Sequence, residues 1–495
     1  MADEDRRGIR GVALPTRFLV PAAAFLCGAA VMVVELLGVR LIAPVFGAGL
    51  HVWAALISTA LAGLAIGYFA GGRLADRAPG PRLYFSLVLV SGLLVAALPL
   101  YASALIGAFA GAGLRTGALL AAAVTFLPPL VLLGATGPPA LRAVAHGLDE
   151  VGRKAGGLYA LSTLGSVAGT LLTGFVLAPE LRIDDTLRLF GLAVALPGAL
   201  GLLLCRRARA AGAGLLLLGV SFFVPGASPR AAFGTPVFAA DTPFQRVEVT
   251  DHRGERWLFL DGCVHSRMAL GPPADPGASY IRLFRFLPAF RPEARSLLML
   301  GLGAGALAPL LSAEDYRITA VEIDPVVVTA ARERFGTLGG IGNVIVGDAR
   351  TFVRRATERF DLVALDVCGS DWMPEHLVTR EFFREVRGVL APGGVLAVNA
   401  IGEVGGRALA ALGATLRDVY PHADAFAGNP EGPLTNVVFY ASDEPLVPSF
   451  AFEDEAAASR YPPGPGDVLT DQRNPVNHWN AGASRLIRRT RAERY

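Results

Sequence analysis

Seven long apolar stretches occupy the first 225 residues, and they constrain the fold more than any other feature of the chain. They cover residues 18–46, 52–72, 83–110, 117–141, 157–178, 187–204 and 211–225. About 20 apolar residues in a helix cross the ~30 Å hydrocarbon layer, and most of the stretches reach that length. The composition, 53% hydrophobic and 18% charged, is too apolar for an ordinary soluble protein. Residues 18–225 are therefore predicted to form a multi-spanning α-helical membrane bundle.

Basic residues are distributed unevenly between these stretches. Clusters of them follow the second, fourth and sixth stretches, whereas the intervening connections hold only Arg115, Arg182 and Arg188. Loops rich in Lys and Arg stay in the cytoplasm. Because residues 1–17 are also rich in arginine, they are predicted to be a cytoplasmic N-terminus. The stretch at 18–46 is too long for a signal peptide and is expected to be retained as the first span.

Some residues inside the membrane half suggest more than a hydrophobic anchor. Glu35 and Arg40 lie within the first stretch, where a charge costs at least ~2.5 kcal/mol and usually faces a partner or an aqueous cavity. Five residues turn a helix by about 140°, so the two side chains do not face each other. They are interpreted either as a polar site for an amine or head group, or as interhelical pairing or snorkelling. Pro-Pro pairs at 128–129 and 138–139 predict broken helix and, with it, a cavity.

A change of composition near Pro225 marks a second, soluble region. A linker rich in Pro, Gly and Ser is predicted at 226–236. Short alternating strands and a turn at Asp261-Gly262 predict a small β-subdomain at 237–290. A larger α/β domain is predicted at 291–445, and a tail at 446–495.

Four buried strands of the α/β domain each end in a glycine or an acid. The strands are predicted at 296–300, 318–321, 343–346 and 360–365. Ligands bind at the carboxyl ends of strands in open α/β sheets, where glycines let a nucleotide approach the backbone and an acid accepts the ribose hydroxyls. These candidate cofactor-binding and catalytic residues are Gly301, Gly303, Gly305, Glu322, Asp324, Asp348, Ala349 and Asp366.

The same pattern indicates which cofactor is expected. No Lys or Arg follows the glycines to hold a phosphate, which favours a nucleoside of the adenosylmethionine type over NAD or ATP. The predicted fold is therefore a Rossmann-like α/β domain of the class I methyltransferase type. The four cysteines form no C-x-x-C pair, so no metal site is predicted, and a net charge of +3 gives no indication of nucleic-acid binding.

At this point a family resemblance becomes visible. Residues 237–440 resemble spermidine synthases, and the whole chain resembles bacterial fused proteins that join a multi-spanning membrane region to a spermidine-synthase-like domain. The segments that carry the second resemblance are Glu35–Pro44 with Gly71–Asp76, Pro374–Phe383 and Leu469–Asp471. Taken alone, the stretch Gly71–Arg77 also resembles a loop of major facilitator transporters.

The resemblance implies roles for individual residues. Gln245 and Glu322 would hold the nucleoside, Asp348 would contact the adenine amino group, and Asp366 would orient and deprotonate the attacking amine. The last role agrees with the chemistry, because a protonated amine is not a nucleophile and needs a proton acceptor beside the electrophilic carbon.

The acceptor side of the site departs from the family pattern. Where spermidine synthases carry a Gln and acids for the distal amine, this chain has His265 and the segment 277–282, of which only Tyr280 matches. The family's Asp-Ser-Ser-Asp-Pro is replaced by residues 366–371. Tyr280 and Asp371 are kept as candidate catalytic residues, and putrescine is not favoured as the acceptor.

These observations predict a membrane-bound transferase that uses decarboxylated or intact S-adenosylmethionine to alkylate an amine, most simply by aminopropyl transfer. A transporter or sensor of polyamines and a methyltransferase with a lipid or membrane acceptor are the alternatives. The expected partners are a small amine or polyamine and the lipid bilayer, and a homodimer is allowed. His376 is interpreted as either a proton carrier or a structural hydrogen-bonding residue near a helix start, and Asp471 as either a site-lining or a turn residue.

The expected location is the inner membrane, with the transferase domain in the cytoplasm where its cofactor is found. A seventh crossing would contradict this location. Because the stretch at 211–225 has only 15 residues and ends in a proline, the preferred interpretation is a re-entrant or interfacial segment, or a miscounted span upstream, within a total of about 6–8 spans.

Overall fold

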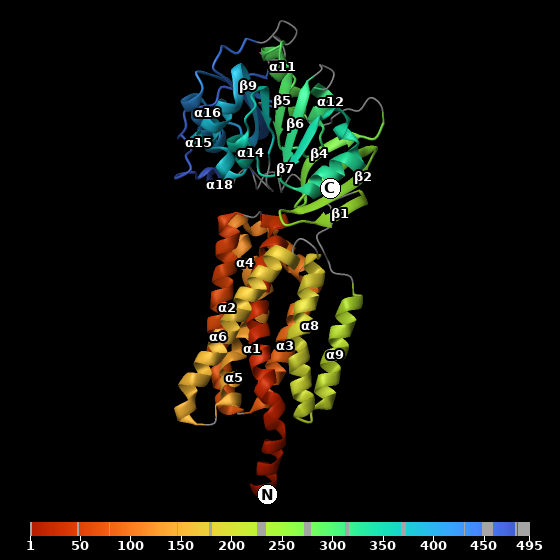
Figure 1. Cartoon of the computed structure of the whole chain (residues 1–495), viewed down its shortest axis with the longest axis vertical. Helices are drawn as coiled ribbons and strands as arrows, with labels where there is room; N and C mark the ends of the chain where they lie inside the picture. Colours follow the sequence, from red (N-terminus) through yellow and green to blue (C-terminus); the bar gives the residue numbers. More distant parts are fainter. Residues whose placement is uncertain are drawn as a thin grey trace. The chain divides into compact units, whose positions relative to one another are not determined.

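The structure is a computed structural model that describes residues 2–46, 49–78, 80–145, 147–177, 181–224, 234–271, 279–311, 316–367, 373–429, 431–447, 459–480 and 483. The chain divides into two compact units, Met1–Pro229 and Arg230–Tyr495 (Figure 1). Most of the predicted linker at 226–236 lies outside the described residues.

The N-terminal unit is helical throughout. Within the described residues, six helices are long and apolar enough to cross a membrane, which indicates a membrane protein. Large apolar side chains that stay exposed, such as Leu61, Phe69 and Leu164, are concentrated in this unit. The helices are α1 (Ala2–Phe46), α2 (Leu50–Arg77), α3 (Pro81–Ala108), α4 (Leu114–Ala135), α5 (Gly137–Val144), α6 (Leu148–Leu172), α8 (Ile183–Leu204) and α9 (Ala208–Phe223).

Glycines bring pairs of these helices into backbone contact. On α6, a Cβ at Gly165 would overlap the carbonyl of Phe25 in α1, and Gly169 faces Ala29 in the same way. Gly67 of α2 meets α4 through the same kind of contact. Lipid supplies no hydrophobic drive between helices, so small residues that allow close van der Waals packing hold such bundles together.

Replacing Gly165 by alanine is expected to destabilise the bundle, because the added methyl group would force α1 and α6 apart at a typical overpacking cost of about 1–3 kcal/mol. Gly157→Ala is the matched control, since the same helix has open space there and alanine favours a helix over glycine. Thermal melting of the detergent-solubilised full chain should fall for Gly165→Ala alone. Equal melting temperatures for the two variants would contradict the close contact.

The break in the fourth apolar stretch lies at Thr136, between α4 and α5. The prediction that the pair at 128–129 also breaks the helix is wrong, because both prolines lie inside α4, which continues to Ala135. The pair at 138–139 opens α5, where the missing N–H groups would have no partner in any case. The transporter-like stretch Gly71–Arg77 is the end of α2, and its Asp76 pairs with Arg142 of α5 at 2.9 Å.

The last apolar segment forms α9, a single helix of 16 residues. It begins just after the end of α8, and the carbonyl of Val224 beyond its last turn accepts a 2.6 Å hydrogen bond from Arg188 in the second turn of α8. The helix therefore runs back along α8 without turning within its length. A re-entrant segment would turn back, so that part of the prediction is wrong. At 1.5 Å per residue α9 is about 24 Å long, shorter than the hydrocarbon layer.

The C-terminal unit begins with an antiparallel sheet of four strands, β1 (Thr235–Asp241), β2 (Arg246–His252), β3 (Glu255–Leu260) and β4 (Cys263–Ala269), in that order. Two-residue turns at Arg253-Gly254 and Asp261-Gly262 join the last three strands, and all four turn residues have positive φ. This is the type I′ geometry that matches the twist of a hairpin. The predicted β-subdomain and its Asp-Gly turn are confirmed.

The larger sheet has the strand order β10-β11-β9-β8-β5-β6-β7. The five strands from β9 to β7 are parallel, and β10 and β11 are antiparallel to their neighbours. The strands are β5 (Ser296–Leu300), β6 (Arg317–Glu322), β7 (Asn343–Val346), β8 (Phe360–Leu365), β9 (Leu390–Glu403), β10 (His422–Ala427) and β11 (Leu434–Ser442).

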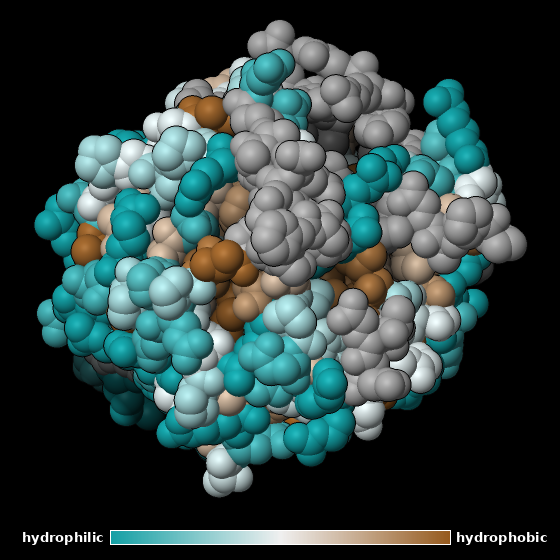
Figure 2. Space-filling view, turned by 90° about the horizontal axis from the view of Figure 1, so that it is seen from above, coloured by the Kyte–Doolittle hydropathy of each residue, from teal (hydrophilic) through white to brown (hydrophobic). Residues whose placement is uncertain are grey.

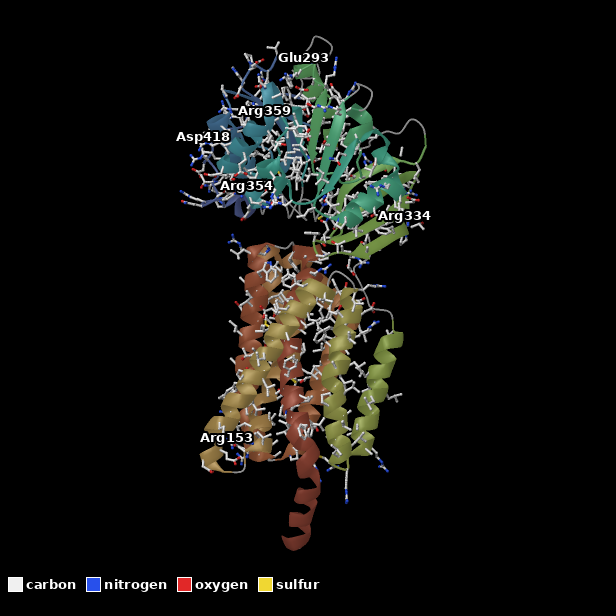
Figure 3. The ribbon with its side chains drawn as sticks, viewed as in Figure 1. Arg153, Glu293, Arg334, Arg354, Arg359 and Asp418 are labelled. Atoms are coloured by element: carbon white, nitrogen blue, oxygen red, sulfur yellow. The ribbon has the colours of Figure 1, made fainter. Side chains whose placement is uncertain are left out.

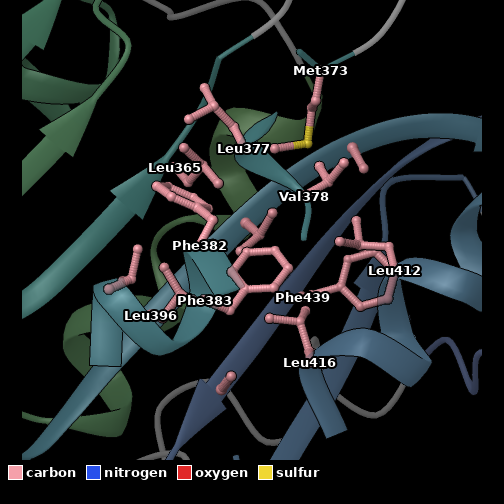
Figure 4. Packing of buried hydrophobic residues seen from close by; sticks show 14 of the residues in the cluster. Leu365, Met373, Leu377, Val378, Phe382, Phe383, Leu396, Leu412, Leu416 and Phe439 are labelled. Carbon is pink, nitrogen blue, oxygen red and sulfur yellow. The ribbon is translucent and has the colours of Figure 1, made fainter. Parts of the chain in front are cut away.

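Helices cover both faces of this sheet and bury alternate residues of its strands. On one face Leu298 and Leu300 pack with helices α15 (Arg380–Val389) and α16 (Arg407–Val419), and Figure 4 shows this cluster around Phe382 and Leu412. On the other face, Leu297 and Met299 pack with the short helices α11 (Phe286–Phe290) and α12 (Leu307–Leu311). The predicted membrane bundle followed by a Rossmann-like domain is thus confirmed. Figure 2 shows a face made largely of hydrophilic residues, with hydrophobic ones in small patches.

A buried arginine attaches the tail segment 459–480 to the sheet domain. Arg350 of α14 (Ala349–Arg355) donates to the carboxylate of Asp471 at 2.8 and 2.7 Å, and to Glu385 of α15 at 2.8 Å. Arg354, labelled in Figure 3, also donates to Glu385 at 2.8 Å. The Arg350 guanidinium holds the pKa of Asp471 below its usual value. Asp471 is therefore a structural anchor of the tail.

Candidate active site

The candidate site lies along the carboxyl ends of five neighbouring parallel strands. In the sheet these strands follow the order β7, β6, β5, β8 and β9. Asp348, Glu322, Gly301 and Asp366 stand at or just past the ends of the first four strands, and Asn399 lies on β9 beside Asp366 in the register of that pair. The sheet thus brings together residues that are separated by up to a hundred positions in the chain.

The turn after β5 adopts a conformation that requires glycine. Gly301, Gly303 and Gly305 have φ angles of +94°, +54° and +71°, a region that side chains disfavour. A Cβ at Gly301 would also overlap the carbonyl of Asp366 on the adjacent strand end. At Gly303 the nearest atom to such a Cβ is Ser266 Oγ of β4, at 3.2 Å. The turn is therefore narrow at its base, where the two strands meet.

Glu322 at the end of β6 fixes the shape of this turn. Its carboxylate is buried and accepts hydrogen bonds from the backbone N–H groups of Leu302 and Asp324, both at 3.1 Å. Burial raises the pKa of Glu322, and the bonds from the backbone oppose that shift. The backbone N–H of Gly303 also lowers the pKa of Glu322 through a hydrogen bond. An ionised carboxylate can accept about four hydrogen bonds, so it keeps capacity for a donor such as a ribose hydroxyl.

Asp324 and Gln245 contact each other rather than standing apart. Asp324 is fully buried and caps α13 (Pro325–Ala330) by accepting the N–H of Val326 at 2.9 Å. It also accepts the hydroxyl of Thr242 at 2.7 Å and, at a long 3.4 Å, the amide of Gln245. The carboxylate of Asp324 thus joins the β1–β2 turn to the larger sheet. Its contacts are those of a residue that positions Gln245.

Asp348 caps α14 at the far side of the site. One of its carboxylate oxygens accepts the N–H of Thr351 at 2.7 Å, and the other lies 3.1 Å from Nε2 of His376. Burial raises the pKa of Asp348, but the hydrogen bonds from Thr351 and His376 outweigh it, and the pKa is lowered. Ala349, the next residue, is buried as the first residue of the helix. Asp348 therefore stays ionised as an acceptor for a donor such as an amino group.

Two asparagines hold Asp366 in place. Asn399 donates to its carboxylate at 2.8 Å, and Asn436 of β11 donates in turn to the side-chain oxygen of Asn399 at 3.1 Å. The backbone N–H of Asp366 is bonded to the carbonyl of Leu300, which keeps its strand end beside the glycine turn. The carboxylate of Asp366 is thus oriented by the side-chain amide of Asn399, which is itself held by the side-chain amide of Asn436 on β11.

Asn399, Asn436 and Thr242 were not among the residues that the sequence singled out. A signal was present for Asn399, which is the polar residue of the otherwise apolar stretch Val395–Ala400, whereas Asn436 only precedes the apolar run Val437–Tyr440. No such pattern marks Thr242, whose contact with Asp324 depends on chain segments 82 positions apart.

The acceptor side of the site is only partly described. Asp371 and the side chain of Tyr280 lie outside the described residues, so their expected roles stay predictions. His265 is half-buried on β4, and Arg282 is exposed on α10 (Ser279–Leu283). Within the described part of the chain, no group of acids, histidines and cysteines could hold a metal ion.

Comparison with known proteins extends these observations. Residues 298–398 match the family described as Methyltransferase domain. The polyamine aminopropyltransferase of Vibrio vulnificus is 33% identical over 169 residues, which are 32% of this chain and 56% of that protein. The chain thus matches little more than half of the length of this relative. The polyamine aminopropyltransferase of Mycobacterium tuberculosis is 27% identical over 420 residues, a match that covers 78% of this chain and 77% of that protein.

A match of that extent is longer than the C-terminal unit alone, so it includes part of the helical unit. Among solved structures, a probable spermidine synthase from Corynebacterium glutamicum has a TM-score of 0.40 and 21% identity, and covers 46% of this chain and 85% of its own. These matches indicate that the chain is a transferase with a methyltransferase-type domain. More narrowly, the chain is similar to polyamine aminopropyltransferases, in agreement with the resemblance in its sequence.

Asn399→Ala is expected to lower the turnover number of the transferase reaction about tenfold or more. The carboxylate of Asp366 would lose the hydrogen bond that orients it, and such a bond to a charged group is typically worth about 1.5–3 kcal/mol. Binding of methylthioadenosine, measured by calorimetry, should change little. Asn343→Ala, at an exposed position of β7, is the control. A variant with normal turnover and weakened nucleoside binding would contradict the assigned role.

Proposed function

We propose that this protein transfers an aminopropyl group from decarboxylated S-adenosylmethionine to an amine. The observation that carries the proposal is the carboxylate of Asp366, held by Asn399 beside a glycine turn whose adjoining acids fit a nucleoside. Glu322 would accept the ribose hydroxyls, Asp348 with Ala349 would contact the adenine, and Gly301, Gly303 and Gly305 would let the nucleoside approach the backbone. Gln245, which is hydrogen-bonded to Asp324, would contact the nucleoside from the side of the β-subdomain.

The reaction asks little of the protein beyond position and a proton acceptor. The cofactor supplies a methylene carbon activated by the sulfonium. The amine nitrogen forms a bond to that carbon while the carbon–sulfur bond breaks, and methylthioadenosine leaves with the bonding electron pair. Asp366 accepts the proton that the amine must lose, and Tyr280 and Asp371 are the proposed groups that position the amine. Holding the two reactants in line converts the step into an effectively unimolecular one.

The acceptor is proposed to be an amine other than putrescine. In place of the family's acids for the distal amine, the chain carries the segment 277–282, which contains no acid and ends in Arg282 on α10. An amine without a distal cation fits this surrounding better. A second reaction, methyl transfer from intact S-adenosylmethionine, is favoured by the match of residues 298–398 to methyltransferase domains.

Mass spectrometry after incubation with each form of the cofactor tests the proposal. With decarboxylated cofactor and a panel of monoamines and polyamines, we expect an aminopropyl adduct and free methylthioadenosine. Asp366→Asn should lower turnover by about 10²–10⁴-fold, the usual contribution of a positioned base, while nucleoside binding persists. Asp418→Asn, on the surface of α16 and labelled in Figure 3, is the control. Methyl adducts alone would replace the proposal with the second reaction.

We further propose that the chain lies in the inner membrane with its transferase unit in the cytoplasm, because the cofactor is cytosolic. Since α9 returns along α8 as far as Arg188, this arrangement requires that α9 does not cross the hydrocarbon layer. Fluorescent-protein and alkaline-phosphatase fusions after Arg207 and after Gly234 test this arrangement. We expect fluorescence and no phosphatase activity at both positions. Phosphatase activity only at the second position would instead make α9 a seventh crossing.

A further inference from the structure

The helical unit contains a cavity that the transferase chemistry does not use. Its volume is about 50 Å³, enough for a few water molecules or one small polar group. Residues of α1, α2, α3, α4, α5 and α6 line it, and none of the described residues that line it is charged. The sequence predicted a cavity from the broken fourth helix, and the break at Thr136 indeed lies in its wall.

Three tyrosines from three different helices share this cavity. They are Tyr68 of α2, Tyr84 of α3 and Tyr159 of α6. The hydroxyl of Tyr84 donates to the carbonyl of Val20 at 3.0 Å, so what this residue offers the cavity is its ring. Several aromatic rings around one space are the usual way in which proteins bind an organic ammonium ion without an ion pair.

An acid stands next to the cavity on the same face of α1. The lining residues of α1 are Ala24, Cys27, Gly28 and Val31, a stripe with helical spacing. Glu35 continues that stripe. It lies four residues beyond Val31, about 40° around the helix and about 6 Å farther along its axis, and seven residues beyond Gly28, about 20° around the helix. That step is comparable with the length of a short alkyl diamine.

Glu35 has no counter-ion of its own in the part of the chain that the structure describes. It makes no hydrogen bond or ion pair there, although it lies inside an apolar span and is half-buried. Arg40 is not its partner, as the helical spacing predicted. An unpaired acid inside an apolar span is costly and indicates a functional site, such as a path for a substrate, an ion or a proton.

We propose that the cavity and Glu35 form a binding site for an organic ammonium ion, with a short alkyl diamine as the matching ligand. One ammonium group lies among the rings of Tyr68, Tyr84 and Tyr159, and the other pairs with Glu35. This site is separate from the transferase site and does not depend on the reaction proposed for it. It gives the helical unit a chemical role that agrees with amine metabolism.

Equilibrium binding of radiolabelled putrescine to the full chain in nanodiscs tests the site. The Asp366→Asn variant serves as the background, so that the transferase site contributes equally to every measurement. In that background Glu35→Gln should weaken binding at least about tenfold, the loss expected for a charged hydrogen bond, and Glu35→Asp should restore part of it. Tyr68→Leu and Tyr159→Leu should each weaken binding several-fold, whereas the phenylalanine variants keep the ring and should bind normally.

Tyr101→Leu, on α3 and outside the cavity, is the matched control. The uncharged butanediol of the same length should not compete with putrescine. Glu35→Gln in the otherwise unchanged chain should retain its transferase turnover, which separates this proposal from the previous one. Unchanged putrescine binding in Glu35→Gln, or equal competition by the diol, would overturn the proposal.

Discussion

The geometry of the candidate active site depends on one buried carboxylate. Glu322 ends β6, and its two oxygens hold the N–H groups of Leu302 in the glycine turn and of Asp324 at the start of α13. Glu322 thereby fixes three parts of the α/β unit to each other, namely the turn after β5, the end of β6 and the start of α13. Asp324 then extends the same network into the β-subdomain through Thr242. A cofactor that binds to Glu322 would therefore contact a group that is already rigid.

This arrangement explains which parts of the site the sequence could predict. Residues at strand ends were found because parallel strands present their carboxyl ends at one edge, and Gly301, Glu322, Asp348 and Asp366 follow predicted strands at regular intervals. Asn399 lies within its strand, and its role appears only when β9 is placed next to β8. Likewise, the tether that Asp324 makes could not be predicted from the sequence, because it depends on Thr242 in the turn between β1 and β2.

In the helical unit, too, some features could be predicted from the sequence and others could not. The helices were predicted because the thickness of the bilayer sets their length and its apolar interior sets their hydropathy. The expected break at the pair 128–129 was wrong because a proline inside a helix is tolerated where neighbouring helices support the freed carbonyls, and only the pair at 138–139 coincides with a helix start. The path of α9 could not be predicted from its composition, because it depends on the hydrogen bond between Arg188 and Val224.

The anchor of the tail has a consequence for the ionic conditions under which the C-terminal unit stays intact. The side chain of Arg350 is only 8% exposed, and it faces two carboxylates, whereas the pair of Arg142 and Asp76 in the helical unit is 51% and 76% exposed. Mobile ions screen exposed pairs and reach buried ones poorly. Added salt should therefore loosen the contact between α2 and α5 long before it releases the segment 459–480. The transferase unit can therefore keep its tail in place across a wide range of salt concentrations.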